Sequence, residues 1–251
     1  MKKTFSIITG IYILIILSFV AGLFMYSPFS YVIRSFGAKE TLYALGLSIE
    51  TSIIATIAAA CTAIPVAYFL TKREFKGKAV IETIIDIPII LPPLIIGLGL
   101  LILFGRRLAF LNIVFTKTAI VFAQFFIAAP IMINSMKGVF EQVPEQYENI
   151  GLTLGMNRPN VFYKIVLPIA RYGILSSVLL GFSRALGEFG ATLMVAGATR
   201  FRTETMPIAI FLNISSGDFE IAISIALIYI ILAAFIFLFI RKFLQKRQIW
   251  R

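Results

Sequence analysis

The sequence predicts an all-helical integral membrane protein with six transmembrane helices. Hydrophobic residues make up 59% of its 251 residues and charged residues only 14%, whereas a water-soluble domain carries nearer a quarter charged residues. The mean hydropathy is +0.95. A helix needs roughly 20 residues to cross about 30 Å of hydrocarbon, and six apolar runs reach about that length. They cover residues 5–26, 43–71, 83–105, 118–136, 172–199 and 221–240.

The first run, residues 5–26, follows Met1-Lys2-Lys3 and has the outline of a secretory signal. It is longer than a usual signal core, and no small-x-small cleavage pattern precedes Ser27-Pro28. We therefore expect a retained helix. The two longest runs, 43–71 and 172–199, leave room for a bend or a turn outside the membrane.

The third run contains Pro88, Pro92 and Pro93, followed by Gly97 and Gly99. Each proline lacks a backbone donor and clashes with the preceding turn, so it breaks or kinks a helix. The carbonyls that are freed are tolerated at membrane depth where they face protein or a water-filled cavity. Three prolines in six residues favour an irregular segment near a translocation path, with Pro92 and Pro93 as candidate path or gate residues. An ordinary kink that serves packing is the alternative.

The fifth run carries Arg184 and Glu188, four residues apart and therefore able to pair on one helical face. An isolated charge at the bilayer centre costs at least roughly 2.5–3.5 kcal/mol, so both should face the bundle interior or an aqueous cavity. One interpretation is a buried ion pair that fixes helix register. The other is that Arg184 supplies positive potential to an anion route or gate, with Glu188 holding it in place. Gly187 and Gly190 flank the glutamate and would allow close helix approach.

Other site chemistry is sparse. The chain has no histidine and its carboxylates are scattered, so we expect no metal site and no catalytic nucleophile–base set. Glu50 and Asp86 are weaker candidates for a functional role, because each lies near a span end. Cys61 is the single cysteine, so no intrachain disulfide is expected.

The net charge of +11 is distributed unequally across the predicted membrane. The face that carries Lys2 and Lys3 has 15 basic residues and the other face has 7. By the positive-inside rule, both termini and the long loop 137–171 lie in the cytoplasm. Membrane topology and proximity to membrane lipid therefore explain the positive net charge, and no nucleic-acid partner is expected. The seven residues of the other face are Arg34, Lys39, Arg106, Arg107, Lys117, Arg200 and Arg202.

The loop 137–171 is expected to contain two short helices. Its first apolar positions recur at helical spacing, at Val143, Tyr147, Ile150 and Leu154. Pro144 suits a first turn, and Gly155 suits a helix stop. A second helix is predicted from Asn157 to Leu167, where Pro168 breaks it. Such a pair forms a compact cytoplasmic knob for a partner; a hairpin lying on the lipid surface is the alternative.

The spacing of this loop resembles a family signature. Gly155, nine residues and then Ile165-x-Leu167-Pro168 is similar to the cytoplasmic motif of ABC importer permease subunits, Glu-Ala-Ala, three residues, Gly, nine residues, Ile-x-Leu-Pro. Here Asn149-Ile-Gly151 occupies the Glu-Ala-Ala positions, so the front half of the motif departs from the pattern. The resemblance implies that residues 144–155 sit in a cleft of an ATPase subunit and transmit its motion. The coupling residues it implies are Glu148, Asn149, Gly151, Gly155, Ile165, Leu167 and Pro168.

Four further stretches narrow the resemblance to molybdate, tungstate and sulfate permeases. Residues 86–97, Asp-Ile-Pro-Ile-Ile-Leu-Pro-Pro-Leu-Ile-Ile-Gly, resemble their leucine-proline-proline segment. Residues 183–192, Ser-Arg-Ala-Leu-Gly-Glu-Phe-Gly-Ala-Thr, resemble their fifth-helix signature. Residues 203–210 are similar to the segment after that signature in molybdate and tungstate members, and residues 67–78 fit the second cytoplasmic turn.

The resemblance implies a type I ABC importer permease, acting as a homodimer in the plasma or inner membrane. Its partners would be a second copy of the chain, two cytoplasmic ATPase subunits that use ATP and Mg²⁺, and an external oxyanion-binding protein. The chain itself is expected to hold no cofactor and to be no enzyme, because Gly77-Lys78 is followed by alanine and no phosphate-binding loop occurs. The expected substrate is molybdate or tungstate. Alternatives are a sulfate permease, a self-sufficient secondary anion transporter or channel, and a membrane-embedded enzyme.

Overall fold

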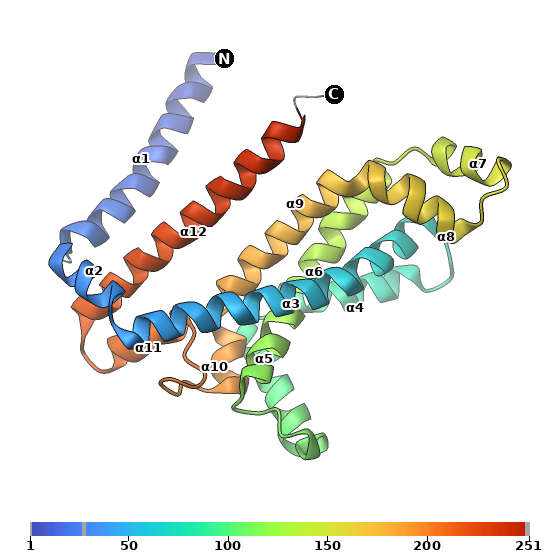
Figure 1. The fold of residues 1–251 in the computed structure, drawn as a ribbon. Helices are drawn as coiled ribbons and strands as arrows, with labels where there is room; N and C mark the ends of the chain where they lie inside the picture. The colour runs from blue at the N-terminus through green and yellow to red at the C-terminus, as the bar shows by residue number, and fades with distance from the viewer. Residues whose placement is uncertain (1, 27–28, 249–251) are drawn as a thin grey trace. The chain divides into compact units, whose positions relative to one another are not determined.

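The computed structural model describes residues 2–26 and 29–248, and in this part of the chain all regular secondary structure is helical, with no strand (Figure 1). Five of its helices are long and apolar enough to cross a membrane, and a bent helix pair makes a sixth candidate. This confirms the predicted all-helical architecture. Met1 and Arg251, on which the predicted placement of the termini partly rests, lie outside the described residues.

The helices group into two compact units, one formed by residues 1–46 and 204–251 and the other by residues 47–203. The first unit is built around α12, which packs on α2, α11 and α1. Its core contains Val32, Met206, Ala209 and Ile225. Its helices are α1 (Lys2–Tyr26), α2 (Phe29–Phe36), the first turns of α3 (Lys39–Lys72), α11 (Met206–Ser215) and α12 (Phe219–Gln248).

The second unit contains the remainder of α3 and the helices up to α10. Its central pair is α6 (Lys117–Glu141) and α9 (Leu167–Leu186), which run side by side (Figure 1). The other elements are α4 (Lys78–Ile90), α5 (Pro93–Ile102), η1 (Leu103–Arg107), η2 (Ala109–Leu111), α7 (Glu145–Thr153), α8 (Arg158–Val161), η3 (Phe162–Val166) and α10 (Gly190–Ala196).

Glycines allow α6 and α9 to approach closely. A Cβ atom added to Gly173 would lie 2.5 Å from Cγ1 of Val139, and one added to Gly181 would collide with the side chain of Met132. Helix pairs in membranes associate through such small residues, since lipid gives no hydrophobic drive for helices to associate. The loop 137–171 and the candidate path residues are therefore attached to one tightly packed helix pair.

Two predicted spans are interrupted in the structure. In the third, α4 and α5 meet at an angle of 107° across Leu91 and Pro92, so the prolines produce a sharp break. In the fifth, α9 ends at Leu186 and α10 begins at Gly190. The spacing of Arg184 and Glu188 suggested that they share one continuous helix. In the structure Arg184 lies in α9, whereas Glu188 lies between α9 and α10.

The predicted break at Pro168 is wrong. Helix continues through it, and residues 158–186 form one apolar stretch long enough to span a membrane. The turn before the proline is widened to a π-helix, η3, in which the N–H of Leu167 donates to the carbonyl of Phe162. A wide turn changes the spacing of carbonyls ahead of the proline ring, which removes the usual clash. The expected second short helix is thus the start of the fifth long helix.

Candidate functional site

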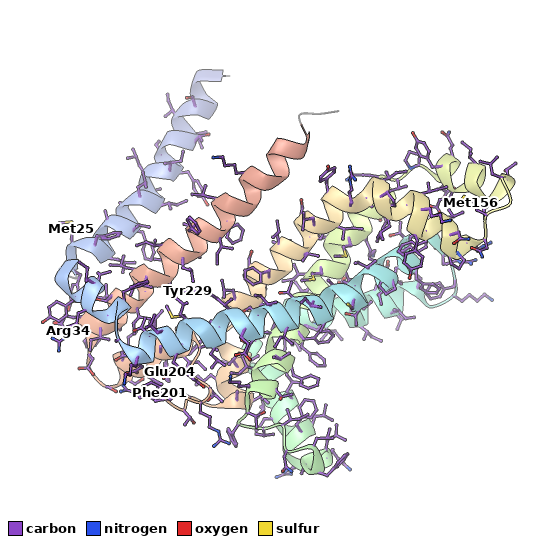
Figure 2. The ribbon with its side chains drawn as sticks, viewed as in Figure 1. Met25, Arg34, Met156, Phe201, Glu204 and Tyr229 are labelled. Carbon is purple, nitrogen blue, oxygen red and sulfur yellow. The ribbon has the colours of Figure 1, made fainter. Side chains whose placement is uncertain are left out.

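The first helix of the loop 137–171, α7, has well-defined ends. Its C-terminus closes with two hydrogen bonds, from the N–H of Gly155 to the carbonyl of Leu152 (3.0 Å) and from Met156 to Gly151 (3.1 Å). This is the Schellman arrangement, which needs a left-handed residue at Gly155, and its φ is +82°. The next helix begins at once, where the Asn157 side chain accepts a hydrogen bond from the N–H of Asn160. Figure 2 shows Met156 at this junction.

Glu148 ties α7 to the end of α3. Its Oε2 atom accepts a hydrogen bond from the Tyr68 hydroxyl (2.9 Å), and its Oε1 atom lies 2.9 Å from Nζ of Lys72. Lys72 also donates to the carbonyl of Val143, just before α7 (3.2 Å). The Lys72 and Glu148 side chains are only 13% and 16% exposed, so the pair is screened less than a surface ion pair. The glutamate predicted for coupling therefore fixes α7 to the transmembrane helix beside it.

Gly151 brings α7 against the start of the fifth helix. A Cβ atom there would lie 2.6 Å from Cδ1 of Ile165 and 3.0 Å from Cγ2 of Val161. The structure thus joins two predicted coupling residues, Gly151 and Ile165, in one contact. Leu167 and Pro168 begin α9, with Pro168 exposed.

The apolar face of α7 points away from the protein. Only Val143, which precedes the helix, is buried. Tyr147, Ile150 and Leu154 are 50%, 56% and 77% exposed. Exposed apolar positions on a helix that is fixed at both ends mark an interaction surface, either for a protein partner or for the membrane. The predicted apolar face of the helix is present, and it points away from the rest of the chain.

A pocket of about 620 Å³ lies beside this helix, between the end of α3 and the α7–α8 region. Aromatic side chains and charged groups of both signs line it, and Asn149 is part of its wall. The lining includes Tyr68, Phe69, Lys72, Arg73, Glu145, Glu148, Arg158, Phe162 and Tyr163.

The proline break of the third span lies against the break of the fifth. A Cβ atom added to Gly190 would lie 3.2 Å from Cβ of Pro93, and one added to Gly97 would lie 2.6 Å from the carbonyl oxygen of Ala191. Helices α5 and α10 therefore pack backbone against backbone. Pro92 precedes α5 and is exposed.

Arg184 and Glu188 do form an ion pair, with Nη1 of the arginine 3.0 Å from Oε2 of the glutamate. The Glu188 side chain is buried, and the Arg184 side chain is 37% exposed. The other carboxylate oxygen accepts a hydrogen bond from the N–H of Ala191 (2.8 Å), in the first turn of α10. A carboxylate at a helix N-terminus stabilises the orphan donors there. Glu188 thus caps α10 and positions an arginine that is partly open to its surroundings.

Sequence reasoning missed two polar contacts between α4 and α6. Nδ2 of Asn134 donates to Oδ1 of Asp86 (2.6 Å), and Nζ of Lys137 pairs with Glu82. Glu82 and Asp86 are four residues apart, and Asn134 and Lys137 are three apart, so each pair shares a helical face. This matched spacing was a usable signal. Glu50, the other weak candidate, pairs with Lys117 across 3.2 Å.

Comparison with known proteins agrees with this architecture. Residues 62–250 match the family model described as the binding-protein-dependent transport system inner membrane component. The chain is 32% identical to the molybdenum transport system permease protein ModB of Mycobacterium bovis, over 78% of this chain and 76% of the relative. It is 31% identical to the sulfate transport system permease protein CysT of Salmonella typhimurium, over 83% of this chain and 78% of the relative.

Solved structures show the same fold. A bacterial alginate ABC transporter, in complex with an alginate-pentasaccharide-bound periplasmic protein, superposes with a TM-score of 0.72 at 16% identity, over 94% of this chain and 91% of that one. Permease subunits of this kind are multi-pass inner-membrane proteins without ATPase activity of their own. The chain belongs to the family of binding-protein-dependent transport system inner membrane components, the permease subunits of ABC importers.

Proposed function

We propose that this permease imports a tetrahedral oxyanion, molybdate or tungstate, as a homodimer driven by two cytoplasmic ABC ATPase subunits. An extracytoplasmic oxyanion-binding protein would deliver the substrate. Relatives at about 30% identity carry molybdenum or sulfate transport in their names, which supports an oxyanion as the class of substrate. Both chain termini would lie in the cytoplasm, as the distribution of basic residues predicts.

The exposed face of α7 carries the proposal for coupling. Tyr147, Ile150 and Leu154 project from a helix that the Glu148 contacts and the Gly151 packing hold against the membrane-spanning helices. A partner that grips this face would move α3 and the fifth helix with it, because the same helix contacts both. The chain carries no phosphate-binding loop, so transport driven by ATP would need such a partner to supply the energy.

The translocation path is proposed to pass the paired helix breaks. Pro92 and Pro93 end the regular hydrogen bonding of α4, and Gly190 lets the second break lie directly against them. Arg184 would supply the positive potential that an anion requires, while Glu188 fixes its position. An ion pair that only stabilises the fold would have the same distances. Transport measured with an Arg184 variant distinguishes this structural role from a role in attracting the anion.

Co-reconstitution tests the proposal. The permease is placed in liposomes with its ATPase and binding protein, and uptake of molybdate, tungstate and sulfate is measured by elemental analysis with and without ATP. Uptake that requires ATP and both partners supports the importer, and preference among the three anions assigns the substrate. Uptake by the permease alone, unaffected by ATP depletion, would instead identify a secondary transporter.

A further inference from the structure

The pocket beside α7 contains two arginines whose charge is not matched by the rest of its lining. Its charged residues are three basic ones, Lys72, Arg73 and Arg158, and two acidic ones, Glu145 and Glu148. Lys72 and Glu148 neutralise each other across 2.9 Å. Arg73 and Arg158 are exposed, and neither forms an ion pair within residues 2–26 and 29–248. With Glu145 counted against them, the pocket keeps an excess of one positive charge.

Each of these arginines lies one helical turn from an aromatic residue of the same pocket. The N–H of Arg73 donates to the carbonyl of Phe69 (3.1 Å), and the N–H of Phe162 donates to the carbonyl of Arg158. Residues four apart in a helical turn share one face. The rings of Tyr68 and Phe162 lie 4.6 Å apart and join the two helices. The pocket therefore has two matching walls, each with an arginine followed by an aromatic ring.

These walls coincide with the ends of two candidate membrane spans. Helix α3 is a candidate span that ends at Lys72, directly before Arg73, and the fifth long helix is a candidate span that begins at Arg158. Both arginines thus lie at a span end, and the aromatic rings lie one turn further into the span. Pro65, which also lines the pocket, precedes the end of α3 by seven residues, about 10 Å along the helix axis. The pocket therefore reaches from the span ends into the apolar part of α3.

We propose that this pocket binds the headgroup of an anionic phospholipid, with its phosphodiester held by Arg73 and Arg158. Guanidinium groups bind phosphate oxygens through paired hydrogen bonds, and basic pockets between membrane helices bind phosphate-bearing headgroups. A volume of about 620 Å³ suits a ligand of this size. One phosphodiester charge balances the excess positive charge, and aromatic rings are enriched at the depth of lipid headgroups.

The apolar half of the pocket favours a lipid over other anionic ligands. A soluble phosphate or a carboxylate of a protein partner would match the arginines, but it would leave the wall formed by Pro65 and Phe69 unfilled. The first carbons of the acyl chains of a phospholipid would cover that wall. The inference goes beyond the proposed function, because it concerns a bound ligand that is not transported.

Lipid binding to the full-length permease in a neutral detergent tests the site without any partner protein. Native mass spectrometry measures the Kd of phosphatidylglycerol for the chain, with phosphatidylcholine as the zwitterionic reference. The wild type should prefer phosphatidylglycerol, and Arg73→Gln and Arg158→Gln should each weaken its binding about fivefold, the factor for one basic residue near an anionic surface. Lys76→Gln is the matched control, because Lys76 is exposed and lies outside the pocket lining. Phosphatidylglycerol should also raise the melting temperature of the wild type and of this control more than that of the arginine variants.

Four results would overturn the proposal. The first is equal affinity of the wild type for the two lipids, or wild-type affinity in both arginine variants. The second is an equal loss in Lys76→Gln, which would reduce the effect to net charge. The third is displacement of phosphatidylglycerol by inorganic phosphate or glycerol 3-phosphate, which would assign the arginines to a soluble phosphate. The fourth is complete loss of the bound lipid when the ATPase subunits are added, which would assign the pocket to that partner. Because the titration uses the permease alone, failure of the proposed transport function would leave its outcome unchanged.

Discussion

Enlarging Gly151 should uncouple ATP hydrolysis from transport. An alanine Cβ at this position would lie 2.6 Å from the tip of Ile165 and 3.0 Å from Val161. Overpacking of this kind costs typically about 1–3 kcal/mol, while replacing a helical glycine by alanine recovers up to about 1 kcal/mol. The net cost of Gly151→Ala is then about 0–2 kcal/mol, because Ile165 can rotate its flexible end. Gly151→Leu leaves no such escape and should displace α7 from the fifth helix.

The assay is the number of oxyanions imported per ATP hydrolysed by the reconstituted transporter. Gly151→Leu should keep its membrane insertion and much of its ATP hydrolysis. The ratio of anions imported to ATP hydrolysed should fall about tenfold or more, because a loss of about 1.4 kcal/mol in the free energy that couples the two processes corresponds to a factor of ten. Gly138→Ala is the control, because a Cβ there meets nothing within 4 Å. Wild-type coupling in Gly151→Leu would refute the reasoning.

Three other variants probe the remaining contacts. Glu148→Gln removes the ion pair with Lys72 inside a largely buried contact, which should cost about 1–3 kcal/mol locally and increase hydrogen exchange in α7; unchanged exchange would show that the pair does not hold the helix. Arg184→Ala should lower the rate of oxyanion uptake more than the yield of folded complex, whereas a loss of folded complex would support a purely structural ion pair. Gly97→Ala should lower the melting temperature of the complex, because its Cβ meets backbone atoms of α10 that cannot rotate away. Gly99→Ala is the control and should leave the melting temperature unchanged, since its Cβ meets nothing within 4 Å. Equal melting temperatures in the two variants would contradict the close packing of α5 on α10.

The spans and helix α7 could be predicted from the sequence because their signals are local. Apolar length alone identifies a membrane helix, and Gly155 ends α7 where its lack of a side chain permits a positive φ. The apolar spacing of Tyr147, Ile150 and Leu154 also predicted a helical face. It could not show that this face is exposed, because exposure depends on which neighbours the chain brings to it.

Interruptions and long-range contacts were the harder part. Three prolines predict a break, but the angle between α4 and α5 depends on α10, which packs against Gly97. Pro168 was predicted to end a helix, and the widened turn before it could not be foreseen from residue types. The contact of Tyr68 with Glu148 joins residues 80 positions apart, so no periodicity could reveal it.

The central claim is that the cytoplasmic loop couples this permease to an ATPase that drives oxyanion import. The most direct test is a cross-link between cysteines placed at Ile150 and on the ATPase surface, measured alongside ATP-driven molybdate uptake in the same liposomes. The account predicts that the cross-link forms in the working transporter and that locking it stops uptake. Full molybdate uptake in the absence of the ATPase would contradict the claim. So would full uptake in a transporter whose position 150 never comes within cross-linking distance of the ATPase.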